Sequence, residues 1–152
     1  MTDYRTLCQN VAGLIGGVPH LIANLANTSA AAWEAMEDIN WIGFYLMEDG
    51  KLVLGPFQGR PACIEIALHR GVCGAAVTTG QTQLVTDVHA FPGHIACDAA
   101  SRSEVVVPIR ARGEIVAVLD VDSPTPGRFT QADKAGLEQL ASVIERELAE
   151  LW

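Results

Sequence analysis

The stretch that decides the fold runs from residue 41 to residue 54 and reads WIGFYLMEDGKLVL. An apolar and aromatic run leads into Asp49-Gly50, a pair that favours tight turns, and a second apolar run follows. This pattern predicts a β-hairpin. Because side chains alternate along a strand, Trp41 and Tyr45 share one face, and the apolar even positions share the other. The even face is typical of core, and the odd face is typical of a pocket wall.

A second hairpin is predicted further along the chain. Residues 105–109 read VVVPI and turn through Arg112-Gly113 into residues 114–122, which read EIVAVLDVD. Apolar residues at helical spacing predict a C-terminal helix, with Thr130 and Asp133 as a capping-box-like start. The other expected elements are helices over 3–14, 19–36 (with Leu21, Leu25, Ser29, Trp33 and Met36 at helical spacing) and 72–79, and strands over 62–68 and 83–85.

This order of elements predicts an α+β domain. We expect an antiparallel sheet of about six strands, with the N- and C-terminal helices packed on one face. No repeat or linker interrupts residues 1–152, so they are predicted to form a single domain. Residues 87–103 have no regular pattern and carry apolar and aromatic side chains. A loop of that length inside a compact domain favours a functional role.

The composition of the chain limits the classes of binding partner to expect. The chain has 152 residues, 49% of them hydrophobic, and a net charge of −8 with scattered lysines and arginines. That balance argues against nucleic-acid and anionic-membrane partners. The sequence contains no signal-peptide pattern and no apolar run near the ~20 residues that cross a bilayer. We therefore expect a cytoplasmic protein, and a homodimer is compatible with these data.

The four cysteines raise a choice between inert and reactive thiols. In a reducing compartment permanent disulfides are rare, so each cysteine is either a small buried residue or a redox group. Cys97 lies in a loop of small residues, where a sulfur is easily approached. Cys63 and Cys73 are alternatives, and Cys73 gains from a helix N-terminus, which lowers a thiol pKa. Cys8 is expected to be incidental.

Two carboxylates end the last predicted strand on the same face. Asp120 and Asp122 stand about 7 Å apart by strand rise. One interpretation is a solvated turn before Ser123-Pro124. The other is a pocket in which neighbouring acids shift each other's pKa values, so that one donates a proton near neutral pH. Glu104, at the entry to the pairing strand, is expected nearby.

A metal site is not expected. Potential ligands are Cys63, Cys73, His89, His94 and Cys97, but their spacing fits no compact zinc site.

Several segments together resemble the free methionine-(R)-sulfoxide reductases, which are single GAF-domain enzymes. The similarity runs from about residue 20 to the end and is carried by residues 26–30 (ANTSA), 38–45 (DINWIGFY), 54–59 (LGPFQG), 71–74 (GVCG), 93–98 (GHIACD) and 119–123 (LDVDS). The resemblance places that family's functional residues on cysteines Cys63, Cys73 and Cys97, on acids Glu104, Asp120 and Asp122, and on substrate-facing aromatics Trp41 and Tyr45.

The resemblance implies a cofactor-free mechanism. Cys97 attacks the sulfoxide sulfur while Asp122 and Glu104 protonate or hydrogen-bond its oxygen. The resulting sulfenic acid condenses with a second thiol, in the first place Cys63, and a thioredoxin-type dithiol reduces the disulfide. Asp120 is assigned to the substrate ammonium, and backbone N–H groups around Cys97 to its carboxylate. The preference for the R epimer comes from the resemblance alone.

A second class of protein shares this fold. A GAF module that senses a ligand or a redox change without catalytic turnover fits the same elements. Three cysteines and three acids argue against a phosphate-bearing ligand, and turnover of methionine sulfoxide separates the two alternatives.

Overall fold

The computed structural model describes residues 1–94 and 97–152. Its elements are α1 (Tyr4–Ile15), α2 (Leu21–Ala35), β1 (Trp41–Glu48), β2 (Lys51–Gly59), β3 (Glu65–Ala67), α3 (Gly71–Thr79), β4 (Gln83–Val85), the 3₁₀ helix η1 (Val88–Ala90), β5 (Ser103–Ala111), β6 (Glu114–Ser123) and α4 (Gln131–Leu148). Within these residues, six strands form one antiparallel sheet in the order β3-β2-β1-β6-β5-β4. The predicted α+β class and both hairpins are confirmed.

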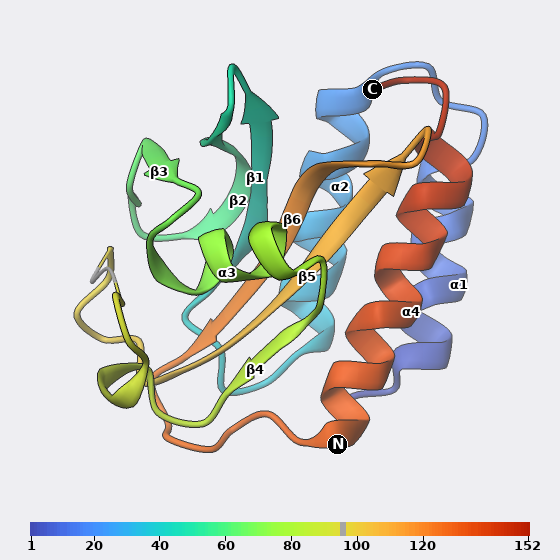
Figure 1. Ribbon diagram of the computed structural model, residues 1–152. Helices are drawn as coiled ribbons and strands as arrows, with labels where there is room; N and C mark the ends of the chain where they lie inside the picture. Colours follow the sequence, from blue (N-terminus) through green and yellow to red (C-terminus); the bar gives the residue numbers. More distant parts are fainter. Residues whose placement is uncertain (95–96) are drawn as a thin grey trace.

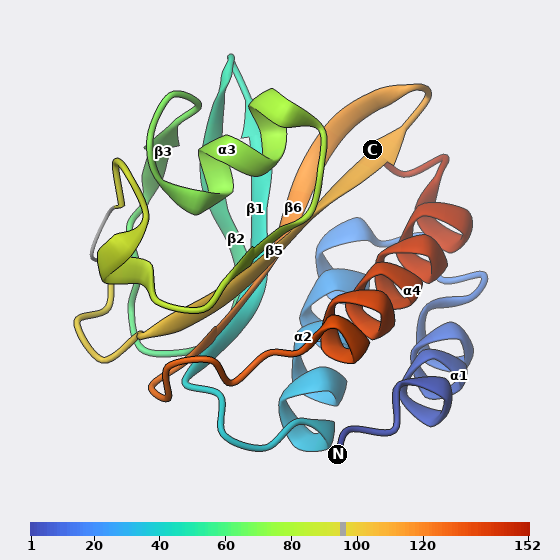
Figure 2. The ribbon, with the colours of Figure 1, turned by 60° about the horizontal axis from the view of Figure 1, so that its bottom comes forward.

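The two faces of the sheet are covered differently (Figures 1 and 2). Helices α2 and α4 lie on one face, and α1 packs across both of them on the outside. On the opposite face, α3 lies above β5 and β6 together with the segments that follow β2 and β4. The expected packing of the N- and C-terminal helices on one face is confirmed.

Alternation along the strands divides the buried residues into two clusters. Even positions of β1 and odd positions of β6, such as Phe44 and Leu119, pack against α1, α2 and α4. Trp41, Tyr45 and Val118 point to the other face and pack near α3. The apolar face is continuous core, so the polar residues of β6 are left on the α3 side.

The helix starts follow the sequence closely. The capping box of α4 forms as expected, because the Thr130 hydroxyl accepts from the Asp133 N–H and the Asp133 carboxylate accepts from the Thr130 N–H. Trp33, expected on the buried side of α2, is instead 36% exposed.

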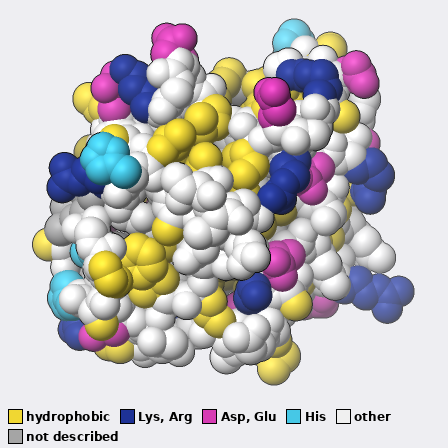
Figure 3. Space-filling model, in the orientation of Figure 1, with side chains coloured by type: hydrophobic (Ala, Val, Ile, Leu, Met, Phe, Trp, Pro, Cys, Tyr) yellow, Lys and Arg dark blue, Asp and Glu magenta, His cyan; other side chains and the backbone are white. Residues whose placement is uncertain are grey.

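No helix in the described part of the chain has the length and apolar character needed to cross a bilayer. Lysines and arginines lie scattered over the face shown in Figure 3.

Two irregular regions differ from the predictions. The strand expected over 62–68 is only β3, because the preceding residues turn toward the α3 side of the sheet. The loop expected over 87–103 contains η1, whose first turn is capped by the Asp87 side chain, and gives way to β5 at Ser103. Part of that loop, Ile95 and Ala96, lies outside the described residues.

Candidate active site

The pairing of β6 with its two neighbours builds a row of polar side chains on the α3 side of the sheet. Asp122 lies opposite Trp41 on β1 and opposite Glu104 on β5. Asp120, one step further along the face, lies opposite Gly43 and Val106. We call Glu104, Asp120 and Asp122 the acid cluster. Their side chains are all buried, so the interpretation of the two aspartates as a solvated turn is wrong.

Burial changes the acidity of the cluster. Loss of solvent raises the pKa of Glu104 well above its ordinary value, and the charges of Asp120 and Asp122 raise it further. Burial, with the charge of Asp120 next, likewise raises the pKa of Asp122. Burial also raises the pKa of Asp120, although the polar side chains of Glu104, Cys73 and Asp122 beside it oppose the shift. The cluster therefore holds protons at a pH where ordinary carboxyl groups have lost them.

A small cavity of about 50 Å³ lies over the cluster. Seven of the eight site residues expected from the sequence line it: Trp41, Tyr45, Cys73, Cys97, Glu104, Asp120 and Asp122. The eighth, Cys63, is joined to the cavity wall through a disulfide bond to Cys97, with the two Cα atoms 5.3 Å apart. The predicted proximity of these two cysteines, 34 residues apart in sequence, is confirmed.

Cys73 behaves differently from the expectation for a thiol in the first turn of a helix. Its side chain is 4% exposed, and its Sγ donates to Asp120 Oδ2 at 3.5 Å. Burial raises the pKa of Cys73 well above its ordinary value, and the nearby carboxylates raise it further. The expected activation by the N-terminus of α3 is therefore wrong, because desolvation and negative neighbours outweigh the helix dipole.

The two aromatic residues of β1 line the cavity and also use their polar tips. Trp41 Nε1 donates to the Arg60 carbonyl at 3.2 Å, and the Tyr45 hydroxyl donates to the Cys63 carbonyl at 3.0 Å. Both side chains thus hold the segment that carries Cys63. A Cβ at Gly43 would lie 2.3 Å from the Cβ of its partner Phe57 on β2, so the glycine permits the close approach of β1 and β2 at this wall.

One polar residue near the site received no role from the sequence. Asn40 Nδ2 donates to Asp98 Oδ2 at 3.0 Å and to Ser101 Oγ at 3.1 Å, and its backbone N–H donates to the Asp122 carbonyl. Asn40 therefore ties the segment after Cys97 to the end of β6. Its place beside Trp41 in residues 38–45 was the available signal, but only the folded chain shows its partners.

Comparisons with known proteins agree with this geometry. Residues 23–148 match the GAF domain family. The free methionine-R-sulfoxide reductase of Escherichia coli (strain K12) is 53% identical over 96% of this chain and 88% of its own length. The reduced form of fRMsr of Staphylococcus aureus superposes with a TM-score of 0.95 at 50% identity, covering 98% of this chain and 97% of that chain. The free methionine-R-sulfoxide reductase of Neisseria meningitidis, in complex with its substrate, superposes with a TM-score of 0.93 at 41% identity. The match covers 97% of this chain and 89% of that chain.

The fold and the matched residues thus define a GAF-domain protein. Within that class, the chain belongs to the free methionine-R-sulfoxide reductase family.

Proposed function

We propose that this protein reduces free methionine-(R)-sulfoxide to methionine by thiol chemistry. The observation that carries the proposal is the Cys63–Cys97 disulfide at a cavity walled by the buried acid cluster. Two cysteines within bonding distance supply two electrons, and protonated carboxyl groups supply protons. The names of the relatives from E. coli and N. meningitidis support the same substrate.

The first step is attack of the Cys97 thiolate on the sulfoxide sulfur. Glu104 or Asp122 donates a proton to the sulfoxide oxygen, which makes the sulfur electrophilic. The Cys97 sulfur bonds to the substrate sulfur. The protonated oxygen then transfers to Cys97 as the substrate S–O bond and the new S–S bond break, and methionine leaves. Cys97 is then a sulfenic acid, oxidised by two electrons. The raised pKa values of Glu104 and Asp122 support this role, because a carboxyl group must hold a proton in order to donate it.

The second step regenerates a reducible enzyme. The Cys63 thiol attacks the sulfenic sulfur, the S–S bond forms, and the oxygen leaves as water. A thioredoxin-type dithiol then reduces the disulfide to two thiols. The pairing with Cys63 rather than Cys73 supports Cys63 as the resolving thiol. We assign Cys73, with its raised pKa, a secondary role.

Recognition of a free amino acid requires partners for both of its charges. We assign the ammonium to Asp120, whose buried Oδ1 has no partner among the described residues, and the methyl-sulfur end to the wall of Trp41 and Tyr45. Backbone N–H groups around Cys97 are assigned to the carboxylate, although Ile95 and Ala96 lie outside the described residues. A peptide substrate would leave these groups unpaired, at a cost of roughly 1–3 kcal/mol each.

The proposal also includes the domain organisation, the cellular location and the substrate epimer. We propose that residues 1–152 act as one GAF domain in the cytoplasm, without a cofactor, on the R epimer named for the relatives. The proposed chemistry uses residues of one chain and is compatible with a homodimer.

The decisive experiment follows NADPH oxidation with thioredoxin, thioredoxin reductase and free methionine-(R)-sulfoxide. We expect many turnovers, with one methionine formed per NADPH, and little activity on N-acetylated, amidated methionine sulfoxide. A redox-sensing GAF module would stop after a single equivalent. Equal kcat/KM for free and blocked substrates would contradict the role of Asp120.

A further inference from the structure

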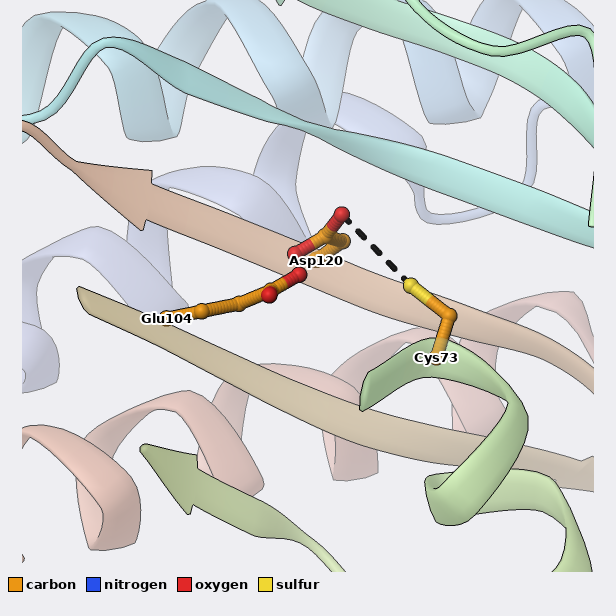
Figure 4. Close-up of side chains that lie close together, drawn as sticks. All are labelled: Cys73, Glu104 and Asp120. Carbon is orange, nitrogen blue, oxygen red and sulfur yellow. Dashed lines mark hydrogen bonds between the residues drawn. The ribbon is translucent and has the colours of Figure 1, made fainter. Parts of the chain in front are cut away.

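Three side chains that line the cavity come from separate elements and converge (Figure 4). Cys73 comes from α3, Glu104 from β5 and Asp120 from β6, and one potential ligand atom of each lies within 4.8 Å of the others. All three residues are buried. We propose that they form a binding site for a thiophilic divalent cation of the Zn²⁺ class in the disulfide-bonded protein.

The spacing of Cys73 and Asp120 suits tetrahedral coordination. Zinc binds thiolate sulfur at about 2.3 Å and carboxylate oxygen at about 2.0 Å, so two tetrahedral ligands of these kinds stand about 3.5 Å apart. The distance from Cys73 Sγ to Asp120 Oδ2 is 3.5 Å. A mixed set of one sulfur and two oxygens matches the borderline-soft character of zinc. An ion can therefore replace the thiol proton without a change in this spacing.

An unpartnered atom supplies a second, independent indication of a ligand. Asp120 is 5% exposed and lines the cavity, yet its Oδ1 has no hydrogen-bond partner among the described residues. The described wall of the cavity contains no lysine or arginine. A dication would replace protons held by these buried groups and offset the negative charge that their release leaves. The cavity of about 50 Å³ has room for a water molecule as a further ligand.

The proposed site differs from the one weighed on sequence spacing. That set consisted of cysteines and histidines, and it included Cys63 and Cys97, which are joined in the disulfide. The set proposed here joins residues 73, 104 and 120, whose spacing does not fit the compact cysteine and histidine motifs for zinc. As the metal–ligand bonds form, the Cys73 proton and any proton held by Glu104 or Asp120 are released to solvent.

A competition between metal and substrate rests on the proposed function. Glu104 and Asp120 are assigned there to the substrate, so a metal ion and methionine sulfoxide would compete for them. In the disulfide-bonded protein, which does not turn over, we expect free methionine sulfoxide to lower the affinity for Zn²⁺. Metal binding itself is measured without turnover, so failure of either proposal is seen separately.

The test uses the disulfide-bonded protein with Cys8 replaced by serine. Cys73 is then the one remaining free thiol. Titration with Co²⁺ is expected to give one bound ion per chain and a thiolate-to-cobalt charge-transfer band in the near ultraviolet, and Zn²⁺ should displace the cobalt. Adding Cys73→Ser should abolish the band and lower the affinity at least about 100-fold, since even outer partners of ligands contribute ten- to a hundredfold.

A carboxylate variant checks the same site if Cys73→Ser fails to fold. Asp120→Asn should weaken cobalt binding by a similar factor, while Glu114→Gln, at the exposed start of β6, should leave it unchanged. Absence of stoichiometric binding would overturn the proposal. So would a charge-transfer band that survives in Cys73→Ser, or equal effects of Asp120→Asn and Glu114→Gln.

Discussion

Two buried acidic centres lie in this protein, and they are built in opposite ways. At the start of α4, Asp133 accepts hydrogen bonds from the Tyr4 hydroxyl at 2.8 Å and from the Thr130 N–H at 2.8 Å, and it pairs with Arg128 at 3.3 Å. In the acid cluster, three carboxyl groups face one another across β5 and β6, and the described wall of their cavity contains no lysine or arginine.

The acidities follow from these surroundings. Burial alone would raise the pKa of Asp133, but hydrogen bonds from Thr130 and Tyr4 and the charge of Arg128 lower it overall. Burial raises the pKa of Glu104 and Asp122, and the neighbouring carboxylates add to the shift. A satisfied buried acid thus stabilises the fold, whereas an unsatisfied cluster costs stability and is available for chemistry.

The largest expected effect is the loss of activity when Cys97, the proposed nucleophile beside the acid cluster, is replaced. Replacing Cys97 with serine should abolish even the first turnover, because the hydroxyl is a far weaker nucleophile than a thiolate and cannot accept the oxygen as a sulfenic acid. The measurement is methionine released per mole of reduced protein. Cys63→Ser should release one equivalent and then stall, and Cys8→Ser should behave as wild type. Stoichiometric methionine from Cys97→Ser would show that another residue is the nucleophile.

The next largest effect is expected for Glu104, whose replacement should change kcat and the melting temperature in opposite directions. Glu104→Gln removes a proton donor and should lower kcat by about 10²–10⁴-fold. It also removes a buried ionisable group, so the melting temperature at neutral pH should rise. Steady-state kinetics and thermal unfolding measure the two quantities, with Glu114→Gln as the exposed control. A fall in melting temperature with little change in kcat would place Glu104 with the stabilising acids.

The two aspartates of the cluster should divide their effects. Asp122→Asn should lower kcat more than it raises KM, because its contact strengthens in the transition state. Asp120→Asn should mainly raise KM for free methionine sulfoxide. Small and equal changes in both constants would remove the distinction between proton donation and substrate binding.

The opposite pattern is expected at the start of α4. Asp133→Ala removes the capping box and leaves the Tyr4 hydroxyl and Arg128 without their partner, so the free energy of unfolding should fall by about 2–3 kcal/mol. The activity of the folded variant should be unchanged. Asp3→Ala, which removes the exposed cap of α1, should lower the free energy of unfolding by clearly less. Loss of activity in folded Asp133→Ala would show that the two centres are coupled.

A smaller effect is expected where the segment after Cys97 is tied to the sheet. Asn40→Ala removes the contacts to Asp98 and Ser101, and kcat/KM should fall about tenfold, equivalent to about 1.4 kcal/mol of positioning. As a positioning residue, Asn40 should also influence the pH dependence of Cys97 alkylation in the reduced protein. Asn10→Ala on the exposed side of α1 is the control. An unchanged alkylation profile together with unchanged kcat/KM would refute the positioning role.

The smallest effect is a difference in pH dependence, measured by urea unfolding from pH 3 to pH 8. The folded pKa of Glu104 is raised, so above its ordinary value of 4.5 the unfolded chain loses a proton that the native state keeps, and stability falls as pH rises. The advantage of Glu104→Gln should therefore be absent below pH 4.5 and grow above it.

Asp133 should give the reverse trend. Its folded pKa is lowered, so its stabilising contribution is present above the ordinary value of 3.8 and is lost as pH falls through the folded value. The deficit of Asp133→Ala should accordingly shrink only in acid. Parallel pH profiles for the two variants would contradict the comparison of the two centres.

Most of the framework could be predicted from the chain. Alternating apolar positions around Asp49-Gly50 and Arg112-Gly113 specified both hairpins, and the Thr130–Asp133 capping box specified the start of α4, because these signals act within a few residues. The family resemblance pointed to the cavity residues. The short β3, η1 and the exposure of Trp33 were missed, since each depends on which distant segment packs against it.

The sequence by itself determined which side chains share a strand face, because the period of a strand is local, and so it placed Asp120 and Asp122 together. Only the tertiary structure decided that this face is buried, that β5 brings Glu104 opposite Asp122, and that Cys73 lies against Asp120. Burial and charge proximity depend on contacts between segments far apart in the chain. They also set the pKa values, and for that reason Cys73, expected to be activated by its helix, has a raised pKa instead.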